Sequence, residues 1–269
     1  MIRVAVLGAA GRMGRQVCKA VAEHPDLSLV AAVSPAHAGL SVGTMIGHVE
    51  IDVPVSGGLG ALETAAAEVA VDFTRPDVVM ANIQWLVQHA VHAVVGTSGI
   101  GPDEIAEIER LIAEGGGKSN VVIAPNFAIG AVLLQRFAVL AARFFPAAEV
   151  IELHHDGKVD APSGTALSTA RRMAEARTEN WLGPTEESLE GARGGDVEGI
   201  RVHSVRLPGL VAHQEVIFGG AGQTLTMRHD SLDRSSFTPG VILAIKAVAS
   251  RPGLTVGLEP ILGLPEASS

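Results

Sequence analysis

The sequence is poor in cysteine, in positive charge and in long apolar runs, and each shortage excludes a class of protein. Its single cysteine, Cys18, excludes an internal disulfide and a cysteine-rich zinc site. The chain has 20 lysines and arginines against 29 aspartates and glutamates, and this acidic balance argues against a protein that binds nucleic acid. The most apolar stretch, residues 121–134, is interrupted by Pro125-Asn126 and is too short for a membrane span. Residues 2–7 lead at once into a glycine turn, unlike a secretory signal. We therefore expect a cytoplasmic protein that binds neither nucleic acid nor a membrane.

The chain does contain enough apolar sequence for a large core. Its 269 residues are 47% hydrophobic, and a compact chain of this length buries about 75% of its unfolded surface. Strands are expected at residues 2–7, 27–33, 69–73, 93–95 and 121–123, and helices at 14–23, 78–89 and 103–114, with a shorter one at 59–67. Continuous apolar strands that alternate with helices are typical of a parallel sheet covered on both faces. The first half therefore predicts an α/β fold with a Rossmann-like doubly wound parallel sheet.

The pattern changes after residue 124. Helices are expected at residues 129–144, 165–176 and 237–249, and strands at 149–153, 201–206, 211–218, 223–229 and 254–258. The alternating strands are typical of an antiparallel or mixed sheet, whereas residues 178–199 read as a surface excursion. We predict a dinucleotide-binding domain of residues 1–126 plus 237–269. A second, α+β domain with a mixed sheet, residues 127–236, would bind substrate and form oligomers.

A glycine-rich turn, Gly8-Ala9-Ala10-Gly11-Arg12-Met13-Gly14, lies between the first strand and the first helix. Glycines let the backbone approach a pyrophosphate closely, and the helix N-terminus supplies N–H donors and partial positive charge. The turn predicts a dinucleotide site, the alternative being a packing turn without a ligand. The second strand ends in Ser34 where such a domain usually has an acid. Because serine does not repel a 2′-phosphate, this position favours NADPH, with NADH as a second cofactor.

A loop of titratable side chains follows the strand at residues 149–153. It contains His154, His155 and Lys158, and it ends in Ser163-Gly164-Thr165 at a predicted helix start. Histidine transfers protons near neutral pH, lysine supplies a fixed charge, and free helix N–H groups hold carboxylates. The loop predicts a small anionic substrate that is protonated while bound.

Plainer readings of the same loop stay open. Asp160 or Ser163 could serve only as a helix cap or turn residue. One of the adjacent histidines could only pack, and the whole loop could be structural. Metal ligation by His154, His155 and Asp156 has no partner cluster elsewhere in the sequence, so we expect no metal.

Two other motifs suggest chemistry that their context does not support. Residues 39–43 match the hydrolase pattern G-x-S-x-G around Ser41, but no strand leads directly into that serine. Cys18 lies within the first predicted helix, where a packed thiol is a poor nucleophile.

Taken together, these motifs resemble the 4-hydroxy-tetrahydrodipicolinate reductase family, also called dihydrodipicolinate reductase. The matching segments, in family order, are residues 8–14, 71–76, 96–99, 124–127, 154–165, 206–215 and 228–239. The resemblance spans nearly the whole chain, and Lys-Val-Asp-Ala-Pro-Ser-Gly-Thr is its most specific part. It implies the NAD(P)H-dependent reduction of a small dicarboxylate, 4-hydroxy-tetrahydrodipicolinate, on the diaminopimelate route to lysine.

The resemblance also implies a role for each matching residue. Gly8, Ala9, Ala10, Gly11, Arg12 and Met13 would hold the pyrophosphate, and Gly96, Thr97, Ser98, Ala124, Pro125, Asn126 and Phe127 would line the nicotinamide side. His154 matches the proton donor or acceptor and Lys158 the second catalytic donor. His155 and the Ser163-Gly164-Thr165 helix start match the substrate site.

The resemblance implies a homotetramer as well. The sequence departs from the family pattern at Ser34, at Ser98 (usually threonine) and at Gly157 (often histidine). The rival readings are another Rossmann-type reductase of amino-acid metabolism, a non-catalytic NAD(P)-sensing protein and, more distantly, a hydrolase that uses Ser41.

Overall fold

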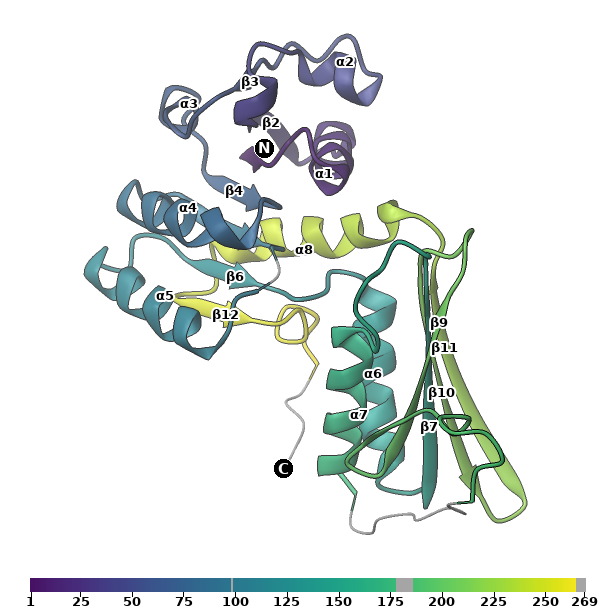
Figure 1. Ribbon diagram of the computed structural model, residues 1–269. Coiled ribbons are helices and arrows are strands. Elements are labelled where there is room, and N and C mark those ends of the chain that lie inside the picture. The colour runs from purple at the N-terminus through teal and green to yellow at the C-terminus, as the bar shows by residue number, and fades with distance from the viewer. Residues whose placement is uncertain (98, 178–185, 265–269) are drawn as a thin grey trace. The chain divides into compact units, whose positions relative to one another are not determined.

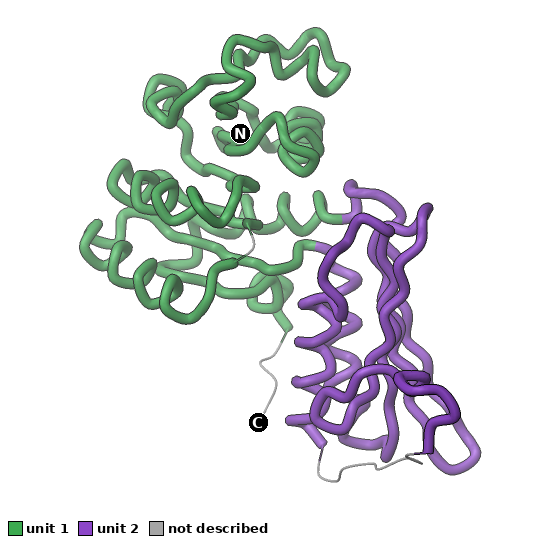
Figure 2. Tube along the Cα trace, in the orientation of Figure 1, with its two compact units in different colours: residues 1–127, 237–266 green, residues 128–236, 267–269 purple. Residues whose placement is uncertain are grey.

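The computed structural model describes residues 1–97, 99–177 and 186–264. The chain divides into two compact units (Figure 2). Unit 1 comprises Met1–Phe127 together with Phe237–Glu266, and Ala128–Ser236 form the main part of unit 2. Each unit has its own sheet and its own apolar core.

Unit 1 is built on a parallel sheet that has seven strands in the described part of the chain. Their order is β12-β6-β5-β4-β1-β2-β3, and every pairing between neighbours is parallel. The strands are β1 (Ile2–Leu7), β2 (Leu27–Val33), β3 (Val55–Ser56), β4 (Val69–Asp72), β5 (His92–Val95), β6 (Val121–Ile123) and β12 (Leu254–Val256). The order 3-2-1-4-5-6 is that of a doubly wound dinucleotide fold, in which the order of successive strands reverses between β1 and β4. The predicted fold class is confirmed.

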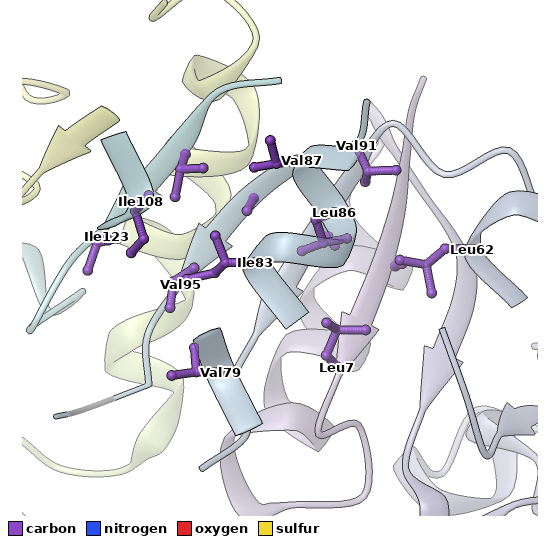
Figure 3. Close-up of a cluster of buried hydrophobic side chains, with 14 of the residues drawn as sticks. Leu7, Leu62, Val79, Ile83, Leu86, Val87, Val91, Val95, Ile108 and Ile123 are labelled. Carbon is purple, nitrogen blue, oxygen red and sulfur yellow. The ribbon is translucent and has the colours of Figure 1, made fainter. Parts of the chain in front are cut away.

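Helices cover this sheet because the strands are apolar on both faces. They are α1 (Arg12–Glu23), α2 (Val42–Ile46), α3 (Gly60–Thr64), α4 (Pro76–Gln88), α5 (Pro102–Glu114) and α8 (Thr238–Val248), with a 3-10 turn η1 at Pro35–His37. Figure 3 shows Ile83 and Leu86 of α4 among the buried side chains of this core, with Leu7 of β1 and Val95 of β5. Full burial of such side chains stabilises the fold by about 1.5–3 kcal/mol each.

Unit 2 is a mixed sheet with two helices packed on one of its faces (Figure 1). The strand order is β11-β10-β7-β9-β8, with β7 and β9 parallel and the other pairs antiparallel. The strands are β7 (Ala147–His154), β8 (Gly195–Val197), β9 (Ile200–Arg206), β10 (Ala212–Gly220) and β11 (Gln223–Ser231); the helices are α6 (Ile129–Ala142) and α7 (Gly164–Glu175), and a 3-10 turn η2 spans Arg234–Phe237. The predicted mixed sheet is confirmed, and β8 lies where a surface excursion was expected.

The face of this sheet that packs against α6 and α7 carries apolar core residues of unit 2. Val150, Val202, Val216 and Phe218 point toward the helices and are fully or almost fully buried.

In the described part of the chain, no helix is long and apolar enough to cross a membrane.

Candidate active site

The glycine turn in unit 1 is packed so tightly that two of its glycines have no room for a side chain. Gly8 has φ +75°, and a Cβ there would lie 2.6 Å from the carbonyl oxygen of Phe73. A Cβ on Gly14 would lie 2.0 Å from the carbonyl oxygen of Gly8. The turn therefore brings β1, the chain after β4 and the start of α1 into direct backbone contact, at the point where the strand order reverses.

The N-terminus of α1 suits an anion. The N–H groups of Gly8 and Ala9 both donate hydrogen bonds to the carbonyl of Val33, at 2.9 and 3.1 Å. The first turn of α1, which begins at Arg12, contains no acidic residue, and its N-cap Gly11 makes no side-chain cap. The N–H groups of the first turn thus remain available for a phosphate, as in other dinucleotide sites. These features fit a bound dinucleotide pyrophosphate.

Ser34 lies directly after β2 and is 8% exposed. Its hydroxyl lies 3.1 Å from Nδ1 of His37, and its N–H donates to the carbonyl of Ser56 at 2.9 Å. The position that usually holds a carboxylate therefore holds a neutral hydroxyl beside an imidazole.

The other predicted cofactor residues follow the carboxyl ends of β5 and β6. Gly96 donates to the carbonyl of Asp72 at 2.9 Å, and Ala124 to the carbonyl of Val95 at 3.1 Å. A Cβ on Gly96 would lie 2.2 Å from the ring of Phe73, and that ring lies 5.8 Å from the ring of Phe127. The aromatic pair therefore requires glycine at this position.

Within the same segments, Thr97 is buried, Pro125 is exposed and Asn126 is half-buried. Ser98 lies outside the described residues.

Asp72, a fully buried carboxylate at the end of β4, lies in the matching segment 71–76, but no role was predicted for it. It accepts hydrogen bonds from the N–H and hydroxyl of Thr74, at 2.8 and 2.6 Å, from Asn82 at 2.8 Å and from Thr97 at 3.0 Å. These bonds join the ends of β4 and β5 to α4. The available signal was an acid that ends an apolar strand and is followed by threonine two residues later.

The histidine loop in unit 2 begins at His154, the last residue of β7. Nδ1 of His154 lies 2.5 Å from Oε2 of Glu152, and the imidazole is 16% exposed. Burial lowers the pKa of His154, the charges of Lys158 and Arg206 lower it further, and Glu152 opposes the change. In the free protein the imidazole is therefore mainly neutral at neutral pH.

Glu152 and Arg206 form a buried ion pair that sequence reasoning also missed. The guanidinium donates two hydrogen bonds to the carboxylate, at 2.7 and 2.8 Å, and Glu152 is fully buried. Burial opposes ionisation of Glu152, but bonds from Arg206, Ser204 and His154 outweigh it and hold its pKa below the usual value. Arg206 also donates to the backbone carbonyls of Lys158 and Asp160, at 3.3 and 2.6 Å. One ion pair thus connects the strand, the histidine and the loop.

Lys158 is held by a carboxylate of its own loop. Its Nζ lies 2.6 and 2.7 Å from the two oxygens of Asp160, and the lysine side chain is 22% exposed against 61% for the aspartate. Asp160 therefore serves as a partner of the lysine and does not cap the helix, which begins at Gly164. A substrate carboxylate that binds Lys158 would take the place of this exposed partner. His155, the residue after His154, is half-buried.

Ser163 is the N-cap of α7. Its hydroxyl accepts the N–H of Ala166 at 3.2 Å, and its own N–H donates to Glu152 at 3.1 Å. The capping role that the sequence left open is therefore the one observed for its hydroxyl. Gly164 is exposed, and a Cβ there would meet none of the described atoms within 4 Å. The N–H groups of Gly164 and Thr165 thus begin the helix next to open space, which suits a carboxylate.

The structure also bears on the rejected motifs. Burial raises the pKa of the Cys18 thiol to about 12, so it is not a reactive thiolate. Ser41 precedes the five-residue helix α2 and forms an isolated antiparallel bridge with Pro54, which is not the strand-to-serine-to-helix setting of a hydrolase. Across the described residues, no group of three or more His, Cys, Asp or Glu could hold a metal ion.

Comparisons with known proteins agree with both units. Models of the N- and C-terminal parts of dihydrodipicolinate reductase match residues 2–127 and 130–262. A 4-hydroxy-tetrahydrodipicolinate reductase of Nocardia farcinica is 52% identical over 267 residues, which cover 98% of this chain and 99% of the relative. One from Cutibacterium acnes is 50% identical over 270 residues, which cover 98% of this chain and 100% of the relative.

Solved structures give the same answer. A dipicolinate-bound dihydrodipicolinate reductase from Paenisporosarcina sp. TG-14 is 41% identical, with a TM-score of 0.83 over 97% of this chain and 99% of the other. An amine dehydrogenase from Mycobacterium smegmatis, 15% identical with a TM-score of 0.65, shares the fold over 100% of this chain and 97% of its own. The resemblance seen in the sequence is confirmed, and the chain belongs to the dihydrodipicolinate reductase family.

Proposed function

We propose that the protein reduces 4-hydroxy-tetrahydrodipicolinate to tetrahydrodipicolinate with NAD(P)H and loss of water, on the diaminopimelate route to lysine. Membership of a reductase family supports the reaction class. The observation that carries the proposal is the loop at residues 154–165, because it combines a proton-transferring histidine, a lysine and a helix N-terminus beside one buried ion pair. An NAD(P)-sensing protein would have no need of this arrangement.

We assign the dinucleotide to unit 1 and the substrate to unit 2. The pyrophosphate would lie against residues 8–13, where the glycines leave room for a close approach, and would accept hydrogen bonds from the free N–H groups of the first turn of α1. The nicotinamide would lie along residues 96–98 and 124–127, at the carboxyl ends of β5 and β6. When bound, the reduced nicotinamide supplies a hydride to the ring carbon that lost the hydroxyl group.

The substrate is a dianion, and unit 2 offers two kinds of partner for its carboxylates. Lys158 supplies a positive charge, and the N–H groups of Gly164 and Thr165 supply donors at a helix N-terminus. His155 belongs to the same loop as Lys158 and would contact the ring or a carboxylate. Together they would fix the ring, a positioning role worth several kcal/mol in catalysis.

Proton transfer is the part that we assign to His154. Water is lost first: the C–OH bond breaks at one ring carbon and a C–H bond breaks at the adjacent one, which leaves a conjugated double bond. The hydride then brings two electrons to the carbon that carried the hydroxyl group, so a proton must reach the adjacent ring position to complete the reduction. His154 would donate it: its N–H bond breaks, a C–H bond forms, and the imidazole becomes neutral. Solvent would supply the proton again before the next transfer.

A direct assay tests the reaction. The purified chain is mixed with NADH or NADPH and with 4-hydroxy-tetrahydrodipicolinate generated freshly from its precursors, and loss of reduced-nicotinamide absorbance is followed. We expect oxidation that depends on the substrate. Oxidation of neither cofactor above the substrate-free rate would refute the proposal.

Lys158→Ala tests the substrate site. Loss of a charged hydrogen bond costs about 1.5–3 kcal/mol, so kcat/KM for the substrate is expected to fall by roughly 10- to 150-fold. KM should rise and kcat should fall, because the lysine both binds and positions the ring. The matched control is Lys246→Ala, which removes a lysine that pairs with Asp26 in unit 1 at 2.7 Å. Equal kinetics for the Lys158 variant and the control would contradict the assignment.

Ser34→Asp tests the preference between NADPH and NADH, since we expect the neutral Ser34 side chain to favour NADPH. A carboxylate there would repel the 2′-phosphate and accept bonds from a free ribose diol. The ratio of kcat/KM for NADPH to that for NADH should fall by about tenfold or more, which corresponds to about 1.4 kcal/mol. Ser250→Asp, at an exposed site beyond α8, is the control for added negative charge. An unchanged ratio would show that Ser34 does not read the 2′ position.

We further propose that the protein is a homotetramer assembled through the sheets of unit 2. The face opposite α6 and α7 carries the half-buried apolar residues Ile151, Leu153, Val205 and Ile217, which alternate along their strands with the core residues. Apolar side chains on an open sheet face are typical of a protein interface. Light scattering should give about four times the chain mass of 27.7 kDa, and the mass of a single chain at micromolar concentration would contradict this.

Because biosynthetic reductases draw on the cytoplasmic NAD(P)H pool, we place the enzyme in the cytoplasm.

A further inference from the structure

The carboxylate of Glu152 lies at the centre of the histidine loop, although it is not one of the residues expected to touch substrate. It is fully buried on the helix-covered face of the sheet. It accepts two hydrogen bonds from Arg206, one from the N–H of Ser163 and one from Nδ1 of His154. Three segments, β7, β9 and the start of α7, therefore converge on one side chain.

The bonds to Glu152 determine which nitrogen of His154 carries the proton. An ionised carboxylate only accepts hydrogen bonds, and two charged bonds from Arg206, at 2.7 and 2.8 Å, favour the ionised form. The 2.5 Å contact between Glu152 Oε2 and His154 Nδ1 therefore needs a hydrogen on Nδ1. A neutral imidazole has one N–H, so the lone pair of His154 remains on Nε2.

We propose that Glu152 is a positioning residue that holds His154 in the Nδ1–H tautomer, so that Nε2 is the nitrogen through which the catalytic proton passes. Arg206 supports this arrangement, since it binds the carboxylate and also the carbonyls of Lys158 and Asp160. The inference rests on the proposed function and adds to it the atom that transfers the proton and the group that selects this atom.

The proton transfer then balances in a single step. The Nε2–H bond of protonated His154 breaks and leaves its electron pair on the ring, while a C–H bond forms at the ring position next to the hydride acceptor. The product imidazole keeps its hydrogen on Nδ1 and its bond to Glu152. The carboxylate does not take the proton; it orients the ring and stabilises the imidazolium, as in other carboxylate–histidine pairs.

The charges around His154 determine the expected pH dependence. Glu152 on its own strand favours the protonated form, whereas Arg206 on β9 and Lys158 in the loop disfavour it. Ala212, its partner on β10, carries no charge. Removing the Glu152 charge therefore lowers the pKa of His154 further. The limb of kcat/KM on which activity falls with rising pH should move to lower pH.

Glu152→Gln is the kinetic test, with Glu149→Gln as its matched control. Glu149 lies on the same strand and also bonds an arginine and a histidine, Arg193 and His203, but it faces the other side of the sheet. We expect kcat of Glu152→Gln to fall by about 10²-fold or more, with KM within a few-fold and the pH limb displaced toward acid. The control should keep both kcat and the limb. A loss of kcat with the limb unmoved would mean that Glu152 is only structural and would overturn the proposal.

A measurement on the unaltered protein decides the tautomer without an assay. Nitrogen-15 NMR of histidine-labelled protein, with the His154 signals assigned from a His154→Asn sample, distinguishes protonated from unprotonated ring nitrogens. We expect a protonated Nδ1 and an unprotonated Nε2 in neutral His154. The reverse assignment would overturn the proposal even if the reductase activity is present, and the expected one would support it even if the substrate assignment fails.

Discussion

His154→Ala is expected to lower kcat by a factor of about 10² to 10⁴, the usual contribution of general acid–base catalysis. KM for the substrate should stay within a few-fold, because Lys158 and the N-terminus of α7 remain to bind the carboxylates. The physical reason is that the proton needed beside the hydride acceptor loses its donor, while the Glu152–Arg206 pair still organises the loop. Steady-state kinetics at saturating cofactor give kcat and KM separately and so show whether only kcat falls.

His203→Ala is the matched control for this variant. His203 lies on β9, and its Nε2 is 2.8 Å from a carboxylate, that of Glu149, so it resembles His154 in chemistry. It faces the opposite side of the sheet, where its register partner on β7 is Ile151. Its removal should leave kcat near the wild-type value. If His154→Ala also kept near wild-type kcat, the proton donor would have to be another group.

Arg206→Met is expected to destabilise unit 2 by about 3–5 kcal/mol at neutral pH, the usual cost of leaving one buried charge without its partner. Glu152 is fully buried and the arginine side chain is 19% exposed, so solvent replaces little of the lost interaction. Urea unfolding of the variant and the wild type gives the difference. Arg201→Met, on the same strand but 3.9 Å from a half-exposed Asp196, should cost less than about 1 kcal/mol.

The loss in free energy of unfolding caused by Arg206→Met should become smaller as the pH is lowered. In the wild type the folded-state pKa of Glu152 is lowered, so its contribution to stability is present above the unfolded pKa and is lost as pH falls through the folded pKa. Without the arginine, burial dominates and raises the folded-state pKa, so the carboxyl group then prefers to be protonated. The gap between variant and wild type should therefore narrow as pH is lowered from 7 toward 5. A gap that is constant with pH would contradict this account of the pair.

The fold of unit 1 could be predicted because its strands are short apolar runs, and burial on both faces requires such runs. Val69–Asp72 and Val121–Ile123 are fully buried strands of this kind. The strands β3 and β8, of two and three residues, were not expected, since neither forms a continuous apolar run. In unit 2 the helix-facing alternation of β7 contains Ala148, Val150 and then Glu152. An acid in that series was a visible anomaly in the sequence.

The partners of the buried carboxylates could not be predicted in the same way. Arg206 is 54 residues from Glu152 in sequence, and only the parallel pairing of β7 with β9 places it next to His154. Asp72 likewise accepts a hydrogen bond from Thr97, which follows the neighbouring strand and is 25 residues away in sequence. Local patterns identified the histidine, the lysine and the helix start, because each lies within one loop. The groups that hold them depend on strand register, which the sequence does not display.

The transfer of deuterium from cofactor to product tests the central claim most directly. The protein is supplied with NADPH that carries deuterium at its transferable position and with freshly generated 4-hydroxy-tetrahydrodipicolinate, and the product is analysed by mass spectrometry and NMR. Reduction by the proposed route predicts one deuterium, at the ring carbon that lost its hydroxyl group, and a solvent-derived hydrogen at the adjacent position. A product without cofactor deuterium, or with the deuterium at another carbon, would contradict the account.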